Sequence, residues 1–237
     1  MFEAIESTDW AAIPGYAKFY NPTVIAAALR RVADAASSTQ AADAASPLFD
    51  GGLVHAHSAG AQPAAVTAAP ILLEIAEHST PARPLALGLL EDAMRYHPYE
   101  GYTSVATVDG PDIPVCCAIA RAIHPRRDLL TTLGRTGKEL LAEAHRHWRF
   151  TINEASAGTE PDSTLALGTL EGLPANPPEP CDMRHPNRSA VRLIATAELA
   201  WPADAPSAET FLLLRGISPD HLPPRTTLWS PCTDRVH

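Results

Sequence analysis

The sequence has few aromatic side chains, almost no lysine and only four cysteines. Hydrophobic residues make up 46% of the chain but aromatic ones only 6%, so alanine supplies much of the apolar content, which suits closely packed helices. Lys18 and Lys138 are the only lysines, an arginine bias typical of GC-rich bacterial genomes. Cys116 and Cys117 are adjacent, which does not fit a conventional disulfide scaffold, and we expect all four cysteines to be reduced.

Long hydrophobic runs are also missing. No stretch approaches the roughly 20 apolar residues that a membrane-spanning helix needs. The sequence does not open with a charged segment followed by an apolar one, as a secretory signal would. We therefore expect a cytoplasmic protein with no membrane partner.

Negative charge predominates and is spread evenly along the chain. The net charge is −9 at pH 7, and no part of the sequence forms a basic stripe. Because proteins hold a phosphate backbone mainly through lysine and arginine, this balance argues against a nucleic-acid partner. An acidic surface attracts basic molecules, so we expect the partner to be another, basic protein. The oligomeric state stays open.

Helical patterns fill the first two thirds of the chain. The first clear helix begins at Asn21, a good N-cap, with Pro22 at the first helical position, and its apolar residues recur at helical spacing to about 36. Further helices are predicted at 40–45, 62–77, 80–96, 112–133 and 136–150. The short connection after 77 predicts an antiparallel helical hairpin.

The character of the sequence changes beyond Glu154, where proline and glycine become frequent. Short β-like runs at 163–170, 190–200 and 209–215 replace the helical period. We therefore expect an α-helical domain at 1–157 and a proline-rich, β-containing segment at 158–237. The predicted fold class is mainly α.

Three segments carry a resemblance to a known family. They read TDWAAIPGYAKFYNPTVIAAALRRVADA near the start, HSAGAQPAAVTAAPILLEIA from His57, and CCAIARAIHPRRDLLTTLG from Cys116. Together they resemble the HEAT-like repeat proteins of GC-rich bacteria, over roughly 9–149. The resemblance implies a HEAT-like helical-hairpin solenoid that offers a surface to partners, followed here by the smaller β-containing segment. The family has no agreed activity to carry over.

Histidine and cysteine suggest two sites. Cys181, His185, Cys232 and His237 have roughly zinc-finger spacing, so zinc is the metal we consider, with unlinked loop residues as the alternative and no other cofactor expected. His55 and His57 lie two apart in a glycine-flanked loop, a spacing that on a strand places both on one face. They are candidates for a metal or general-base role, but the resemblance favours His57 as a hydrogen-bonded brace of the next helix.

Motifs for nucleophilic catalysis and nucleotide binding are absent from the sequence. Tyr96, Tyr99 and Tyr102 gather in the loop 97–111, which with His55 and His57 gives the candidate partner-binding residues. We predict a non-catalytic protein-interaction module, of an antitoxin, immunity or regulatory kind, that binds a basic partner. The alternatives are an enzyme or metal-site protein that uses the His and Cys residues, and a HEAT-type protein that binds DNA lesions.

Overall fold

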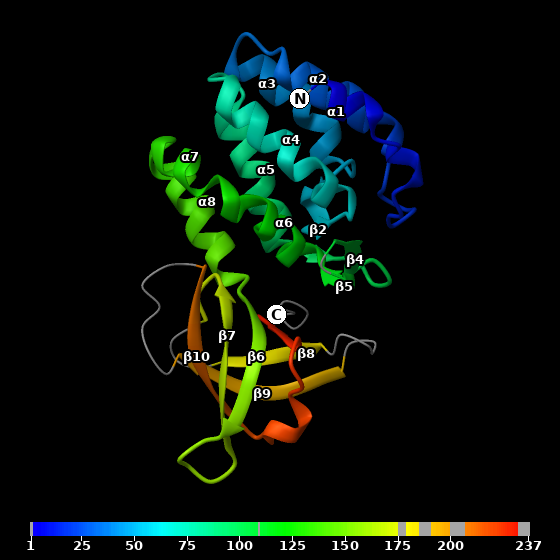
Figure 1. Cartoon of the computed structure of the whole chain (residues 1–237). Helices are drawn as coiled ribbons and strands as arrows, with labels where there is room; N and C mark the ends of the chain where they lie inside the picture. Colours follow the sequence, from blue (N-terminus) through cyan, green and yellow to red (C-terminus); the bar gives the residue numbers. More distant parts are fainter. Residues whose placement is uncertain (1, 109, 175–178, 185–190, 200–206, 232–237) are drawn as a thin grey trace. The chain divides into compact units, whose positions relative to one another are not determined.

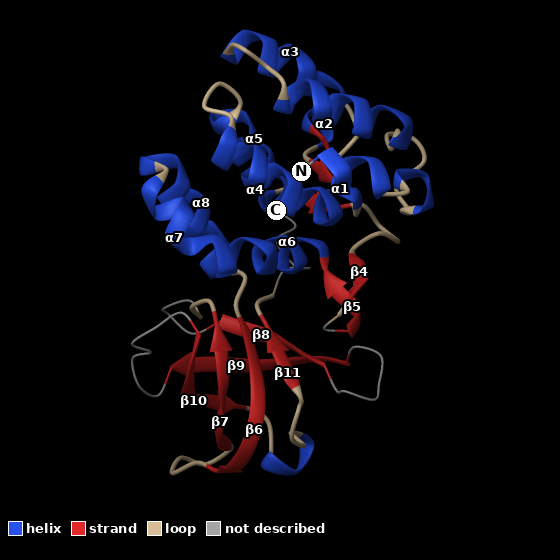
Figure 2. Ribbon diagram, turned by 45° about the horizontal axis from the view of Figure 1, so that its top comes forward, coloured by secondary structure: helices blue, strands red, loops and turns tan. Residues whose placement is uncertain are grey.

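The computed structural model describes residues 2–108, 110–174, 179–184, 191–199 and 207–231. The chain divides into two compact units, Met1–Ala144 and His145–His237 (Figure 1). The division falls earlier than the boundary expected at 157. Figure 2 shows the helices in blue and the strands in red.

Helices make up most of the first unit. They are α1 (Phe2–Ser7), α2 (Ile25–Ala33), α3 (Ser38–Phe49), α4 (Ala64–His78), α5 (Arg83–Arg95), α6 (Val115–Ile123), α7 (Arg127–Thr132) and α8 (Gly134–Arg146). Their apolar faces meet in one core that is rich in alanine, as the composition predicts. Helices α2 and α3 pack together, as do α4 and α5.

Local signals explain several helix starts. The side chain of Asn21 accepts a hydrogen bond from the Thr23 N–H and opens a 3-10 turn, Pro22–Val24, which leads into α2. The side chain of Ser37 caps α3 in the same way. Arg83 at the start of α5 donates from Nε to the Ala76 carbonyl, 2.8 Å away, and so satisfies one of the last carbonyl groups of α4.

Two small sheets also belong to the first unit. Strand β2 (Gly60–Ala61) pairs antiparallel with β1 (Val54–His55) and parallel with β3 (His97–Pro98). Strands β4 (Ser104–Thr107) and β5 (Gly110–Pro114) form a hairpin. These strands lie where the sequence predicted loops, except that the end of β5 overlaps the helix predicted at 112–133.

The second unit contains a closed antiparallel barrel of six strands in the order β10-β7-β6-β11-β8-β9. The strands are β6 (Arg149–Ala157), β7 (Ser163–Glu171), β8 (Glu179–Arg184), β9 (Val191–Leu199), β10 (Ser207–Arg215) and β11 (Thr227–Trp229). Alternating side chains such as Phe150 and Ile152 of β6, and Leu212 and Leu214 of β10, point into one apolar core. Gly168 lets β7 approach β6, because a Cβ there would overlap the Thr151 carbonyl.

The prediction of a mainly α fold, a HEAT-like helical-hairpin solenoid with a smaller β-containing segment, is wrong. The chain is 49% helix and 25% strand, so the two kinds of structure are mixed. The physical reason is that the barrel needs six mutually paired strands, whereas the sequence pattern indicated only three of them. Of the residues that the structure describes, none belongs to a helix both long and apolar enough to span a membrane.

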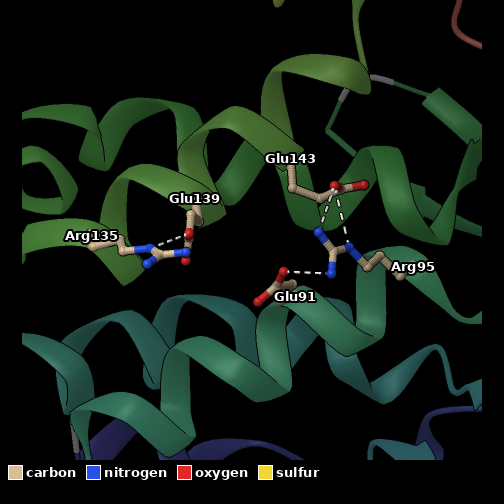
Figure 3. Close-up of polar contacts among 5 residues, drawn as sticks. All are labelled: Glu91, Arg95, Arg135, Glu139 and Glu143. Atoms are coloured by element: carbon tan, nitrogen blue, oxygen red, sulfur yellow. Dashed lines mark hydrogen bonds and ion pairs between the residues drawn. The ribbon is translucent and has the colours of Figure 1, made fainter.

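An arginine on α5 bridges two carboxylates (Figure 3). The Arg95 guanidinium lies 2.7 Å from Glu91 on the same helix and 3.3 Å from Glu143 on α8. The Glu143 side chain is only 3% exposed, whereas that of Arg95 is 52% exposed. A second pair in the same view, Arg135 and Glu139, lies at the surface of α8.

We expect Arg95→Gln to lower the free energy of unfolding by about 1 to 3 kcal/mol, because the buried Glu143 carboxylate then loses the positive charge beside it. Arg135→Gln is the matched control, since it removes an exposed pair within one helix and should leave stability nearly unchanged. Urea unfolding of both variants measures the difference. Equal effects would show that the Glu143 contact contributes no more than a surface ion pair.

Candidate functional site

Four rings from three distant segments meet beside the small β1-β2-β3 sheet. Tyr16 stacks on Tyr99, with ring centroids 4.7 Å apart and planes 18° apart. Phe19 stacks on His55 at 4.1 Å and 15°, and it also lies tilted against both tyrosines. We call these four residues the aromatic cluster. Tyr16 is 36% exposed, so the cluster reaches the surface of the first unit.

A tight turn presents Tyr16 and Phe19. The Phe19 and Tyr20 N–H groups both donate to the Tyr16 carbonyl, which closes the turn. Gly51, at a φ of +112°, allows the chain to pass close by, because a Cβ there would overlap the Phe19 carbonyl oxygen. The turn is therefore held by backbone against the segment that leads into β1.

Tyr20 fixes the other side of the same turn. Its hydroxyl donates to the Trp10 carbonyl at 3.1 Å, and the Trp10 indole N–H donates to the Ile5 carbonyl at the same distance. Burial raises the pKa of Tyr20 to about 12, because it disfavours the phenolate. The Tyr20 side chain, which anchors the turn, therefore stays uncharged well above neutral pH.

A short chain of hydrogen bonds runs along one edge of the aromatic cluster. The Ser58 hydroxyl lies 2.8 Å from His55 Nδ1 and 2.6 Å from the Tyr99 hydroxyl. Ser58 is exposed, while His55 and Tyr99 are half-buried. Ala59, the next residue, has a left-handed backbone with φ 47° and ψ 44°, a conformation that is uncommon for a residue with a side chain.

Gln62 connects the aromatic cluster to the protein interior. Its Oε1 accepts a hydrogen bond from the Tyr16 N–H at 3.1 Å, and the residue is fully buried. Within the described ranges, Gln62 Nε2 is a buried donor with no hydrogen-bond partner. Gln62 therefore positions Tyr16, while its unsatisfied amide donor lowers the stability of the fold.

The structure brings together only some of the predicted partner-binding residues. His55 and Tyr99 belong to the aromatic cluster, and the His57 ring lies edge-on to the His55 ring, with their centroids 6.0 Å apart. Tyr96 packs against the helical core and Tyr102 is half-buried outside the cluster. The prediction that His57 braces the next helix through a hydrogen bond is wrong. His57 is exposed and has no hydrogen bond to any described residue.

Only one of the four predicted zinc ligands lies in the described part of the chain. Cys181 is buried in the apolar core of the barrel. His185, Cys232 and His237 lie outside the described residues. Cys116, Cys117 and Cys181 form no disulfide among the described residues.

Comparison with known proteins identifies no relative: no protein-family model matches the chain, and neither does any curated protein. The resemblance to HEAT-like proteins therefore stays a prediction.

The position of the Tyr99 ring depends on the absence of a side chain at Gly60. A Cβ at Gly60 would overlap the Tyr99 ring and hydroxyl. We expect Gly60→Ala to displace Tyr99 and to lower the free energy of unfolding by about 1 to 3 kcal/mol, as overpacking does. Thermal melting measures the loss of stability.

Gly88 in α5 provides the matched control for Gly60. A Cβ there would meet nothing within 4 Å, so Gly88→Ala should raise stability by about 0.5 to 1 kcal/mol through its higher helix propensity. If Gly60→Ala also melts no lower than the wild-type protein, Tyr99 does not need the space over Gly60.

Proposed function

We propose that this protein binds a basic protein partner and that the aromatic cluster is where the partner docks. The observation that carries the proposal is the stack of four rings, drawn from three segments, with Tyr16 at the surface. Aromatic residues that lie half-exposed on a rigid support are typical of the energetic centres of protein interfaces. Stacking and the buried Gln62 supply that support here.

The charge of the whole chain favours a basic partner, and the rings of the aromatic cluster favour arginine as the residue that docks there. The chain has a net charge of −9, which attracts basic molecules over a distance. At the cluster, a cation already lies over a ring, since Lys18 Nζ is 5.0 Å from the centre of Phe19. An arginine stacked on the exposed part of Tyr16 would add a second cation–π contact, and a guanidinium suits such stacking better than an ammonium group.

The biological role that fits is neutralisation or regulation of a basic protein, as an antitoxin, an immunity protein or a regulatory binder would perform it. A cytoplasmic location and a bacterial source stay predictions. Binding of a DNA lesion is disfavoured by the acidic composition.

The proposal predicts that Tyr16→Ala weakens binding of an arginine-rich peptide by about threefold to thirtyfold, the range that a cation–π contact contributes. Phe2→Ala is the control, because Phe2 is 42% exposed but does not belong to the aromatic cluster. Both variants keep the net charge, so general electrostatic attraction is unchanged. Fluorescence anisotropy with arginine-rich and lysine-rich peptides measures the affinities.

Two results would contradict the proposal. The first is an equal affinity of Tyr16→Ala and Phe2→Ala for the arginine-rich peptide, since binding would then follow net charge alone. The second is tighter binding of a glutamate-rich peptide than of the arginine-rich one. Capture from the native cell with the wild-type protein and both variants then identifies the partner as the basic protein that only Tyr16→Ala loses.

A further inference from the structure

We infer that Ser58 is an activated nucleophile that accepts an acyl group from a carboxylic ester, with His55 as its general base and Tyr99 as a donor to its oxygen. This activity goes beyond the binding proposed above and does not depend on it. The inference rests on the hydrogen-bonded group of Ser58, His55 and Tyr99 and on the exposure of the serine.

The directions of the two hydrogen bonds follow from the chemistry of the groups. The Ser58 hydroxyl has two possible acceptors, His55 Nδ1 at 2.8 Å and the His55 carbonyl at 3.5 Å, and its single proton goes to the nearer Nδ1 when the neutral imidazole carries its proton on Nε2. The Tyr99 hydroxyl, the more acidic of the two hydroxyls, then donates to Ser58 Oγ at 2.6 Å. The serine oxygen thus faces a base for its proton and a donor for the negative charge that develops as the proton leaves.

Both partners of Ser58 are held in place by other rings. His55 is stacked on Phe19 and Tyr99 is stacked on Tyr16, so neither ring can turn away without losing a contact. Gly60 leaves the space that Tyr99 needs to reach the serine. The strained backbone of Ala59 directly follows Ser58, and such strain in proteins gathers at functional sites.

The reaction step balances as follows. A bond forms between Ser58 Oγ and the acyl carbon, the proton of Oγ passes to His55 Nδ1, and the bond from the acyl carbon to the alcohol oxygen breaks. The departing alcohol takes the proton from His55. Water then attacks the acyl-serine with His55 again as the base, which releases the carboxylic acid and restores Ser58.

The test uses a fluorophosphonate, which reacts with activated serines. Here a bond forms between Oγ and phosphorus, fluoride leaves, and His55 takes the proton. We expect peptide mass mapping of the full-length protein to find the adduct on Ser58. Ser46 is the internal control, because it is exposed and faces the Asp50 carboxylate at 3.4 Å instead of a histidine, and it should stay unlabelled.

Two variants test the assigned roles. His55→Gln keeps a hydrogen-bonding side chain but removes the base, and should slow labelling by about 100-fold or more. Tyr99→Phe keeps a ring for the stack but removes the hydroxyl, and should slow labelling by about fivefold. Ser58→Ala should abolish the adduct and retain the affinity for the arginine-rich peptide, which separates this reactivity from partner binding.

The inference is overturned if Ser58 is not labelled, if Ser46 is labelled as fast, or if His55→Gln leaves the rate unchanged. Melting curves of each variant show whether it is folded. Should His55→Gln fail to fold, Tyr99→Phe decides, and an unchanged labelling rate in that variant overturns the inference.

Discussion

The arrangement of His55, Ser58 and Tyr99 depends on close packing at Gly60. In the small sheet its backbone is in register with His55 on one side and with His97 on the other. It must also lack a side chain, because Tyr99 lies where a Cβ would be. A single residue therefore joins two segments that are about 40 positions apart and leaves room for the ring that links them. The contacts of His55, Ser58 and Tyr99 all follow from this pairing.

Local signals in the sequence predicted much of the helical structure. Asn21 and Pro22 mark the turn into α2, and the apolar period locates α4 and α5, because capping and helical spacing act over a few residues. Three strands of the barrel were also predicted, since β7, β9 and β10 are long runs of strand-forming residues.

The remaining strands carried no such signal, and this is why the predicted fold class was wrong. Strand β6 directly follows α8 and was partly assigned to a helix, β8 begins in a proline-rich segment, and β11 has only three residues. Each of them is stabilised by neighbours in the closed barrel that are distant in the sequence. Tertiary pairing of this kind is not visible in a local pattern.

The candidate site, like the fold, was predicted only where the signal is local in the sequence. His55, His57 and Tyr99 were singled out by residue type and loop composition. Tyr16, Phe19 and Ser58 were not, because they become neighbours of His55 and Tyr99 only through the turn at Tyr16 and the register of β2. Tyr96 and Tyr102 have the same residue type as Tyr99 and are close in sequence, yet they point elsewhere.

The closed barrel has a consequence for how the second unit can associate. Each of its six described strands has a neighbour on both sides, although β11 pairs only with 149–151 of β6 and β9 only with 212–215 of β10, so the doubly paired stretches offer no edge to an incoming chain. Recognition by β-augmentation, in which an extended peptide adds a strand to a sheet, needs such an edge. The same double pairing leaves these stretches without a template for edge-to-edge aggregation. A ligand that meets them must therefore be recognised through side chains or loops and not through backbone hydrogen bonds.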